Sequence, residues 1–342
     1  MVKVSLSRKF RTKGFAIVTC HAFANLVKSS GTKKPSKNKT SSSLLMKKRS
    51  TSQTALKPSC NYAILLAITA LALCACWPVV ALADDCPSTT KWRVTTGSWF
   101  VDGNWDNHVP DSSRAAQINN GGTAQISADA PMAEACSLTL GLNPGDSGTV
   151  EVSPAHGDLS IVEAIFVGKG GKGNLTQTFG TITSASGSIA SLSGSNGSVT
   201  VDGTTSSWRV SGEVDVGGTT TVAGGTGLLT VTNSAAVTGA SVHVYPSGTL
   251  TGNGTVSTTG GTIIEGTLQP SGGRLTIGGD LSFNGTAPLM ESNVTPTSQD
   301  NVYVSSGAAS LTGRLKVTMT GTFTPGTTYT LLHADKAESA LS

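Results

Sequence analysis

The sequence contains few charged residues, few aromatic residues and no long stretch with the apolar spacing of a helix. Charged residues make up 13% of the 342 residues, and aromatic residues make up 5%. Without apolar residues at every third or fourth position, a helical bundle is excluded. A disordered linker is excluded as well, because β-branched residues recur at alternating positions. The sequence therefore predicts an all-β fold.

Acidic residues are absent from positions 1–83, which hold 14 of the 24 Lys and Arg residues and none of the 20 Asp and Glu residues. The rest of the chain carries 10 basic and 20 acidic residues, a formal net charge of −10. Such different charge predicts two separate parts. Binding to nucleic acid or to an anionic membrane surface is disfavoured, because the acidic part lacks the basic surface that phosphates need.

A secretory signal peptide is predicted at the end of the acid-free segment. Residues 62–83 read YAILLAITALALCACWPVVALA, follow the basic stretch 47–49 and end in small residues at Ala81 and Ala83. A basic region, an apolar region and a small-x-small ending define a cleavage site. We expect cleavage between Ala83 and Asp84, export, and no stable membrane span afterwards.

Other interpretations of this leader stay open. The apolar run is long enough for a membrane anchor, and Cys76 stands where a lipoprotein carries its lipid. Met46 is an alternative start, because the basic stretch follows it directly. A basic leader without acids also suits a mitochondrial transit peptide, although the apolar run behind it does not.

Only two cysteines follow the predicted cleavage site. The four cysteines of the leader are Cys20, Cys60, Cys74 and Cys76. Export would place Cys86 and Cys136 in an oxidising compartment, where a disulfide persists. A bond between them would close a loop of about 50 residues, and the alternative is a pair of free thiols. Their spacing does not suggest a zinc site.

An internal repeat predicts how short strands with period-two alternation are arranged. The segment GTVEVSPAHGDLSIVEAIFVG at 148–168 recurs 49 residues later as GSVTVDGTTSSWRVSGEVDVG at 197–217. Corresponding apolar positions include Val150 and Val199, Leu159 and Trp208, and Val167 and Val216. Repeated alternation is typical of stacked strands. We predict a right-handed parallel β-helix of about ten turns of roughly 20–25 residues each, with Trp208 in its core.

Strand and domain boundaries follow from the same pattern. The clearest strands are predicted at 149–152, 198–201, 229–232, 262–264, 275–277 and 315–318, with glycine-rich turns between them. The parts are a leader and signal peptide at 1–83, an N-terminal aromatic cap at 84–130, β-solenoid repeats at 131–281 and a C-terminal cap at 282–342. The aromatic residues of the first cap are Trp92, Trp99, Phe100 and Trp105.

Several phrases of the sequence resemble the passenger regions of bacterial autotransporters. They are GSWFVDGNWDNHVPDSSRAAQINNGGTAQI at 97–126, VGKGGKGNLTQTFGTITS at 167–184, GSNGSVTVDGTTSSWRVSGEVDVGG at 194–218, GLLTVTNSAAVT at 227–238 and two C-terminal segments at 248–285 and 300–334. Each phrase is low in complexity, and their order makes the combination specific. The resemblance implies a β-helix with a cell-surface, adhesive or virulence-related role and an unknown surface ligand, a host protein or a glycan.

The family exports its passenger with a C-terminal β-barrel, and no such barrel follows in this sequence, which stops at Ser342. We therefore expect a fragment of a larger autotransporter, or a passenger-like protein that is periplasmic as given. Joined to a barrel, the same chain would reach the cell surface or the medium.

Two glycine-rich motifs are interpreted as repeat turns. Residues 168–173 satisfy GxGxxG, but the residues that follow predict a strand, so no helix N-terminus would hold a pyrophosphate. Residues 145–148 read GDSG, like the nucleophile segment of trypsin-like proteases, but the repeat places Asn196 at the position of Ser147. Neither motif predicts chemistry.

Glu213 and Asp215 stand two residues apart on a predicted strand, so both carboxylates face the same side. Their spacing suits acid–base chemistry on a glycosidic bond. Val214 and Val216 are expected to point inward, which places the two acids on a solvated face. A polysaccharide-acting enzyme using these carboxylates is therefore an alternative hypothesis and not the preferred one.

No catalytic, cofactor-binding or metal-binding residues are predicted. The histidines after the leader, which are too dispersed to suggest a metal site, are His108, His156, His243 and His333. The preferred hypothesis is an exported, non-enzymatic protein. A polysaccharide-acting β-helix enzyme and a non-functional gene remnant are the alternatives.

Overall fold

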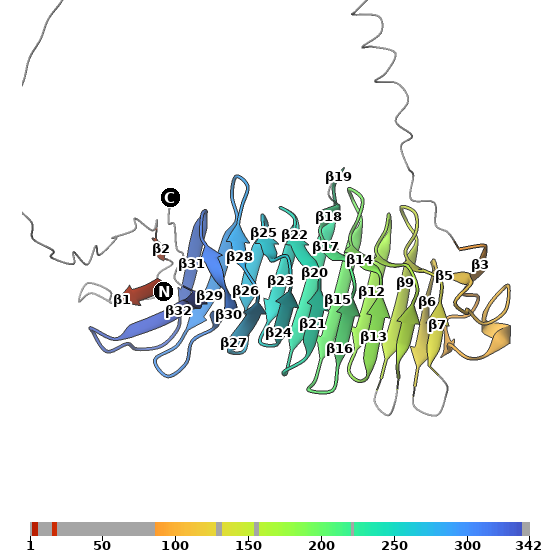
Figure 1. Ribbon diagram of the computed structural model, residues 1–342, viewed down its shortest axis with the longest axis horizontal. Helices are drawn as coiled ribbons and strands as arrows, with labels where there is room; N and C mark the ends of the chain where they lie inside the picture. Colours follow the sequence, from red (N-terminus) through yellow and green to blue (C-terminus); the bar gives the residue numbers. More distant parts are fainter. Residues whose placement is uncertain are drawn as a thin grey trace, which may run out of the picture. The chain divides into compact units, whose positions relative to one another are not determined.

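A computed structural model describes residues 2–5, 16–18, 86–127, 132–153, 157–219 and 222–336. Apart from one turn of 3-10 helix, η1 (Asp102–Asn104), the regular elements of these residues are β-strands. The strands stack side by side along one axis as a parallel β-solenoid of about ten turns (Figure 1). The predicted all-β solenoid is confirmed.

Each full turn contributes one strand to each of three faces. The first face contains β3 (Ser88–Lys91), β5 (Arg114–Ile118), β8 (Leu138–Leu140), β11 (Ala164–Val167), β14 (Ser186–Ile189), β17 (Glu213–Val216), β22 (Ser241–Val244), β25 (Thr262–Ile264) and β28 (Leu281–Phe283). The second face contains β4 (Thr96–Ser98), β6 (Asn120–Ile126), β9 (Ser147–Val152), β12 (Lys172–Gln177), β15 (Asn196–Asp202), β20 (Thr226–Thr232), β23 (Gly248–Gly252), β26 (Thr267–Pro270), β29 (Leu289–Val294) and β31 (Arg314–Met319). The third face contains β7 (Ala133–Ala135), β10 (Leu159–Ile161), β13 (Thr181–Ser184), β16 (Ser207–Val210), β21 (Ala236–Gly239), β24 (Thr255–Thr258), β27 (Arg274–Gly278), β30 (Asn301–Ser310) and β32 (Thr328–Lys336).

The core is a set of apolar columns, because alternate residues of every strand point inward. On the second face, one column consists of Val150, Leu175, Val199, Leu229, Leu250 and Leu268, which pair in register from turn to turn. All six side chains are fully buried. The six strands predicted from the alternation are therefore confirmed, within β9, β15, β20, β25, β27 and β31.

The 49-residue repeat spans two turns of the solenoid. Leu159 pairs with Ile182 of the next turn, and Ile182 pairs with Trp208 of the turn after that. The same holds for Val167, which lies two turns from Val216 through Ile189. This agrees with the predicted turn length of roughly 20–25 residues, since the intermediate turn keeps the same inward pattern with different apolar side chains.

Trp208 fills the interior, as predicted. Its side chain is fully buried, and its indole nitrogen donates a hydrogen bond of 3.1 Å to Ser184 Oγ. The ring occupies space that a side chain at Gly187 would need, because a Cβ there would lie 2.5 Å from the ring. Glycine at position 187 and tryptophan at position 208 therefore form one packing unit.

The N-terminal end of the solenoid is closed by three tryptophans. Trp92, Trp99 and Trp105 are at most 4% exposed and belong to the common core. The Trp105 ring contacts the other two edge to face, with centroids 4.9 Å apart in each pair. Its indole nitrogen donates to the carbonyl of Trp99 at 2.8 Å. The aromatic cluster thus shields the apolar core of the first turns from water.

The solenoid continues beyond residue 281, where the sequence pattern suggested that the repeats end. Strands β29 and β31 pair in parallel on the second face, and β30 pairs in parallel with β27 and with β28. The longer strands predicted for the C-terminal cap are therefore further turns of the same three faces. β30 is long because it contributes to two faces, pairing with β27 through residues 301–304 and with β28 through residues 309–310.

Part of the acid-free segment pairs with the last turn. Strand β1 (Val2–Ser5) is antiparallel to β32, and β2 (Ala16–Val18) is antiparallel to β31. This differs from the prediction that residues 1–83 and the rest do not share a folding unit. The physical reason is that β31 and β32 end the parallel stack, so their free N–H and C=O groups can pair with any extended segment.

Truncation of Trp208 tests the column. We expect Trp208→Ala to lower the free energy of unfolding by about 3–5 kcal/mol, because it leaves a cavity beside Gly187. Leu192→Ala is the matched control, since Leu192 is 46% exposed, and it should change stability by less than about 0.5 kcal/mol. Urea unfolding followed by circular dichroism measures both, and equal effects would contradict a buried Trp208.

Candidate functional site

Polar side chains gather on the outer surface of the first face, around strand β17. Glu213 and Asp215 alternate with Val214 and Val216, which are fully buried. The two acids therefore point outward, as the sequence predicted. Both are nevertheless only partly exposed.

His243 lies beside these acids although it is distant in sequence. In the parallel pairing of β17 with β22, Asp215 is opposite His243 and Glu213 is opposite Ser241. One ligand atom each from Glu213, Asp215 and His243 lies within 4.8 Å of the other two. The sequence spacing of the histidines did not suggest a metal site, but His243 lies beside two acids because each turn of a solenoid brings together residues that are distant in sequence.

Two more side chains complete this cluster, and the sequence did not indicate either of them. The Tyr245 ring stacks on the His243 ring with centroids 3.9 Å apart and an interplanar angle of 22°. Glu265, which follows β25, places its Oε1 3.3 Å from His243 Nε2. We call Glu213, Asp215, His243, Tyr245 and Glu265 the acid–histidine cluster.

Several polar atoms of the cluster are buried without a hydrogen-bond partner. They are Asp215 Oδ1, His243 Nε2 and Tyr245 Oη. Tyr245 is only 7% exposed, and its hydroxyl lies close enough to the Asp215 carboxylate to interact with it. Glu213 differs, because its Oε1 accepts a hydrogen bond of 3.1 Å from Ser241 Oγ. Buried polar atoms without partners are costly and unusual.

The electrostatics of the cluster are dominated by burial and like charge. Burial, together with the neighbouring Glu213 carboxylate, raises the pKa of Asp215 to about 6, while Tyr245 and His243 act in the opposite direction. Burial and the nearby Asp215 carboxylate raise the pKa of Tyr245 above its usual range. The five residues thus combine excess negative charge with incomplete solvation.

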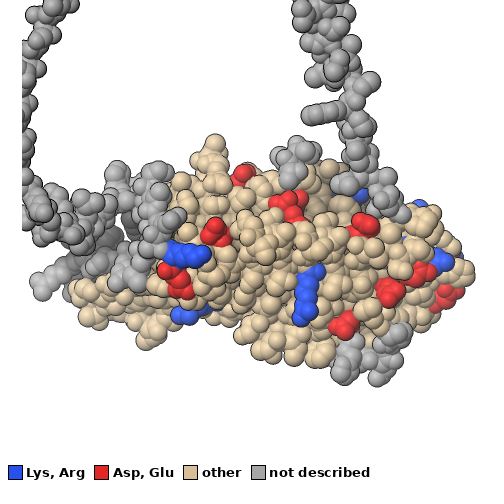
Figure 2. Space-filling model, in the orientation of Figure 1, with Lys and Arg blue, Asp and Glu red and all other residues tan. Residues whose placement is uncertain are grey.

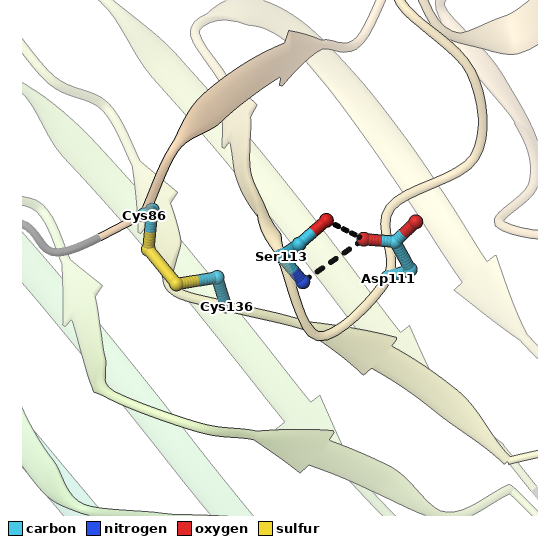
Figure 3. Close-up of a disulfide and its surroundings, with 4 residues drawn as sticks. All are labelled: Cys86, Asp111, Ser113 and Cys136. Atoms are coloured by element: carbon cyan, nitrogen blue, oxygen red, sulfur yellow. Dashed lines mark hydrogen bonds between the residues drawn. A yellow bond between two sulfur atoms is a disulfide. The ribbon is translucent and has the colours of Figure 1, made fainter.

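The other predicted site residues are the cysteines and the cleavage site. Cys86 and Cys136 form a disulfide, with their Cα atoms 5.7 Å apart (Figure 3). The bond ties the start of β3 to the segment between β7 and β8. Ala81, Ala83 and Asp84 lie outside the described residues.

A polar turn lies next to the disulfide. Asp111 accepts hydrogen bonds from the side chain and the backbone N–H of Ser113, at 2.6 and 2.9 Å (Figure 3). These hydrogen bonds from Ser113, with the nearby Arg114, lower the pKa of Asp111. An aspartate that accepts such bonds fixes the turn that leads into β5.

Both glycine-rich motifs lie in neighbouring turns of one corner. Lys172 N donates to the carbonyl of Asp146, and Asp146 Oδ2 accepts from the backbone of Asn143. A shallow hollow of about 320 Å³ is lined there by residues of both motifs, among them Gly145, Gly170 and Gly171. Strand β12 begins at Lys172, within the GxGxxG motif, and continues beyond it. The interpretation of both motifs as repeat turns is confirmed by this geometry.

Comparison with models of known protein families gives no match, and neither curated proteins nor solved structures give one. Among the residues that the structure describes, no helix has the length and apolar character needed to cross a bilayer. The class of protein that the structure defines is a β-solenoid of parallel strands.

The disulfide predicts a local effect on stability. Because it closes a loop of 50 residues, replacing both cysteines (Cys86→Ser with Cys136→Ser) should lower the stability of the first turns by about 2–4 kcal/mol. Hydrogen exchange should then accelerate in β3 and β5 and stay unchanged in β15 and β20, because contacts in a solenoid are limited to neighbouring turns. Unchanged exchange in β3 and β5 would contradict this.

The raised pKa of Asp215 predicts how the stability of the folded protein changes with pH. Its pKa is raised to about 6 in the folded protein, so the folded state binds a proton more tightly than the unfolded state. Its contribution to stability is therefore present at low pH and is lost as pH rises through 6. Glu213, Tyr245 and His243 act on the same carboxylate and define its environment.

The comparison of wild type with Asp215→Asn isolates this effect. In the presence of a chelator, the stability of wild type relative to Asp215→Asn should decrease between pH 5 and pH 7.5, measured by thermal unfolding. Glu134→Gln is a control on the third face, and its stability relative to wild type should not follow this trend. A wild type that gains stability over Asp215→Asn as pH rises would show that the carboxylate is not held as described.

Proposed function

We propose that the protein is an exported, non-enzymatic β-solenoid that presents an extended polar surface to a ligand at or beyond the cell surface. The support comes from the second face. Its outer row places Thr176, Thr200, Thr230 and Thr251 in register over four successive turns. All four threonines are half-buried, and their inward neighbours are fully buried.

We call these four threonines the threonine ladder. Charged side chains of the same outer row lie only beyond its two ends. Glu151 precedes Thr176, and Gln269 follows Thr251, ahead of Glu291 and Lys316. Glu291 forms an ion pair with Lys316 at 2.9 Å and accepts a hydrogen bond from Gln269. The ladder is therefore a flat, uncharged surface with hydroxyls at the strand spacing of about 4.8 Å.

Charged side chains are sparse on the surface. On the face drawn in Figure 2, scattered acidic and basic side chains are separated by broad areas without charge. A regular array of hydroxyls matches the repeating hydrogen-bond groups of a glycan or of an extended protein segment. The disulfide fits an oxidising compartment, and the resemblance to autotransporter passengers points to the same place.

A second candidate function rests on the acid–histidine cluster. Asp215, with its pKa raised to about 6, could donate a proton beside Glu213, as the acid of a polysaccharide-cleaving pair does. Loss of glycan cleavage in Glu213→Ala or Asp215→Ala would favour this enzyme. Absence of cleavage of any glycan by the wild type would rule it out.

The binding role is tested by removing hydroxyls while keeping side-chain shape. Thr200→Val with Thr230→Val should abolish saturable binding to the recognised member of a panel of glycans and matrix proteins, without loss of fold. Thr183→Val with Thr238→Val is the matched control on the third face and should bind as wild type. Binding that survives in the ladder variant and fails in the control would contradict the proposal.

Export is tested separately at the predicted cleavage site. Expressed with its leader in a Gram-negative host, the chain should be recovered outside the cytoplasm with Asp84 as its first residue, as measured by intact mass. Ala83→Phe should block cleavage, because only small residues are accepted there, whereas Leu82→Phe at the tolerant position should not. Uncleaved wild type in the cytoplasm would contradict export.

A further inference from the structure

The acid–histidine cluster has the composition and geometry of a metal site. It brings carboxylates of Glu213 and Asp215 and a ring nitrogen of His243 within 4.8 Å of one another. No ion pair in the described part of the chain connects a lysine or arginine to these residues. The negative charge of the cluster is therefore balanced only by His243, and only when its ring is protonated.

The unpartnered atoms point to the same conclusion independently. Tyr245 is more than nine-tenths buried, and its hydroxyl, which faces Asp215, has no hydrogen-bond partner. Asp215 Oδ1 is also buried without a hydrogen-bond partner. A carboxylate oxygen with a free lone pair and a hydroxyl with an unused proton are what a bound cation and its surrounding hydrogen bonds would satisfy.

We propose that Glu213, Asp215 and His243 bind a zinc ion on the outside of the solenoid. Imidazole nitrogen together with carboxylate oxygen is a donor set for zinc, whereas calcium prefers oxygen donors alone. Three protein ligands leave a further position for water. The site is distinct from the threonine ladder, which lies on the second face.

The remaining side chains act as positioning residues. Metal-binding histidines usually meet a carboxylate through their second ring nitrogen, and Glu265 lies 3.3 Å from His243 Nε2. Ser241 Oγ already orients Glu213 through a hydrogen bond. Stacking on Tyr245 fixes the plane of the His243 ring. This support explains why so many polar groups surround one outward position of the sheet.

The ion would cross-link two successive turns at the point where the chain makes an additional hairpin. The ligands come from β17 and β22, and between these strands the chain makes the additional hairpin of β18 (Gly218–Thr219) and β19 (Val222–Ala223). In a solenoid, each turn is held only by its neighbours. Zinc bound to the folded state alone would raise its stability in proportion to the logarithm of free zinc.

Zinc titration of the full chain tests the proposal. The leader cysteines are themselves zinc ligands, so the chain should carry Cys20→Ser, Cys60→Ser, Cys74→Ser and Cys76→Ser. After treatment with a chelator, isothermal titration should show one zinc ion bound per chain, and zinc should raise the melting temperature. Asp215→Asn and His243→Gln should each weaken zinc binding by at least about tenfold.

His333→Gln is the matched control. His333 Nε2 also lies 3.3 Å from a carboxylate oxygen, that of Asp335, and its ring stacks on Tyr303. It lacks the two additional carboxylates, so its replacement should leave zinc binding unchanged. Circular dichroism confirms that each variant is folded.

Cobalt(II) gives a readout that does not depend on stability. Bound at this site, it should show visible d–d absorption that disappears in His243→Gln and persists in His333→Gln. The proposal is overturned if wild type shows no saturable zinc binding, if Asp215→Asn and His243→Gln bind zinc as wild type does, or if calcium binds more tightly than zinc.

Discussion

Register between successive turns is the constraint on which the rest of this structure depends. Every strand has one face inside and one outside, so a shift of a single residue would turn the apolar columns toward water. In register, Val199 pairs with Leu175 and Leu229 in the interior. The threonine that follows each of these residues pairs with its counterparts on the outside. Core, threonine ladder and acid–histidine cluster are therefore consequences of one pairing. None of them exists in an isolated turn.

The two ends of the solenoid are covered in different ways. At the N-terminal end, Trp92, Trp99 and Trp105 cover the apolar column, and the disulfide of Cys86 holds the first strand to a later turn. At the other end, β31 and β32 pair with short antiparallel strands of the acid-free segment. If the leader is removed as proposed, those edges become free, which makes them the part of the molecule most able to pair with another chain.

The sequence was sufficient to predict the fold class, because period-two alternation of apolar residues and an internal repeat are both direct consequences of stacked strands. The repeat of 49 residues predicted the burial of Trp208, and it spans two turns, with Ile182 and Ile189 at the corresponding inward positions of the intermediate turn. The end of the solenoid was misplaced near Leu281. Longer strands suggested a cap, whereas parallel pairing continues to Lys336.

The sequence indicated only the two neighbouring acids of the acid–histidine cluster. Glu213 and Asp215 stand out because two acids flank a buried valine, but the neighbours of Asp215 depend on turn lengths that no local pattern encodes. His243 reaches it only because the intervening turn, with its additional hairpin, returns the chain to the same register. Tyr245 and Glu265 follow their strands by one residue, so their approach to His243 depends on how each corner bends.

Pulsed electron–electron double resonance between spin labels on Glu151→Cys and Thr251→Cys tests most directly whether the turns stack in register. These positions are four turns apart on one outer row. Stacking in register predicts a narrow distance distribution centred at about 19 Å, four times the strand spacing of about 4.8 Å. A broad distribution, or a distance far from this value, would contradict the stacked register.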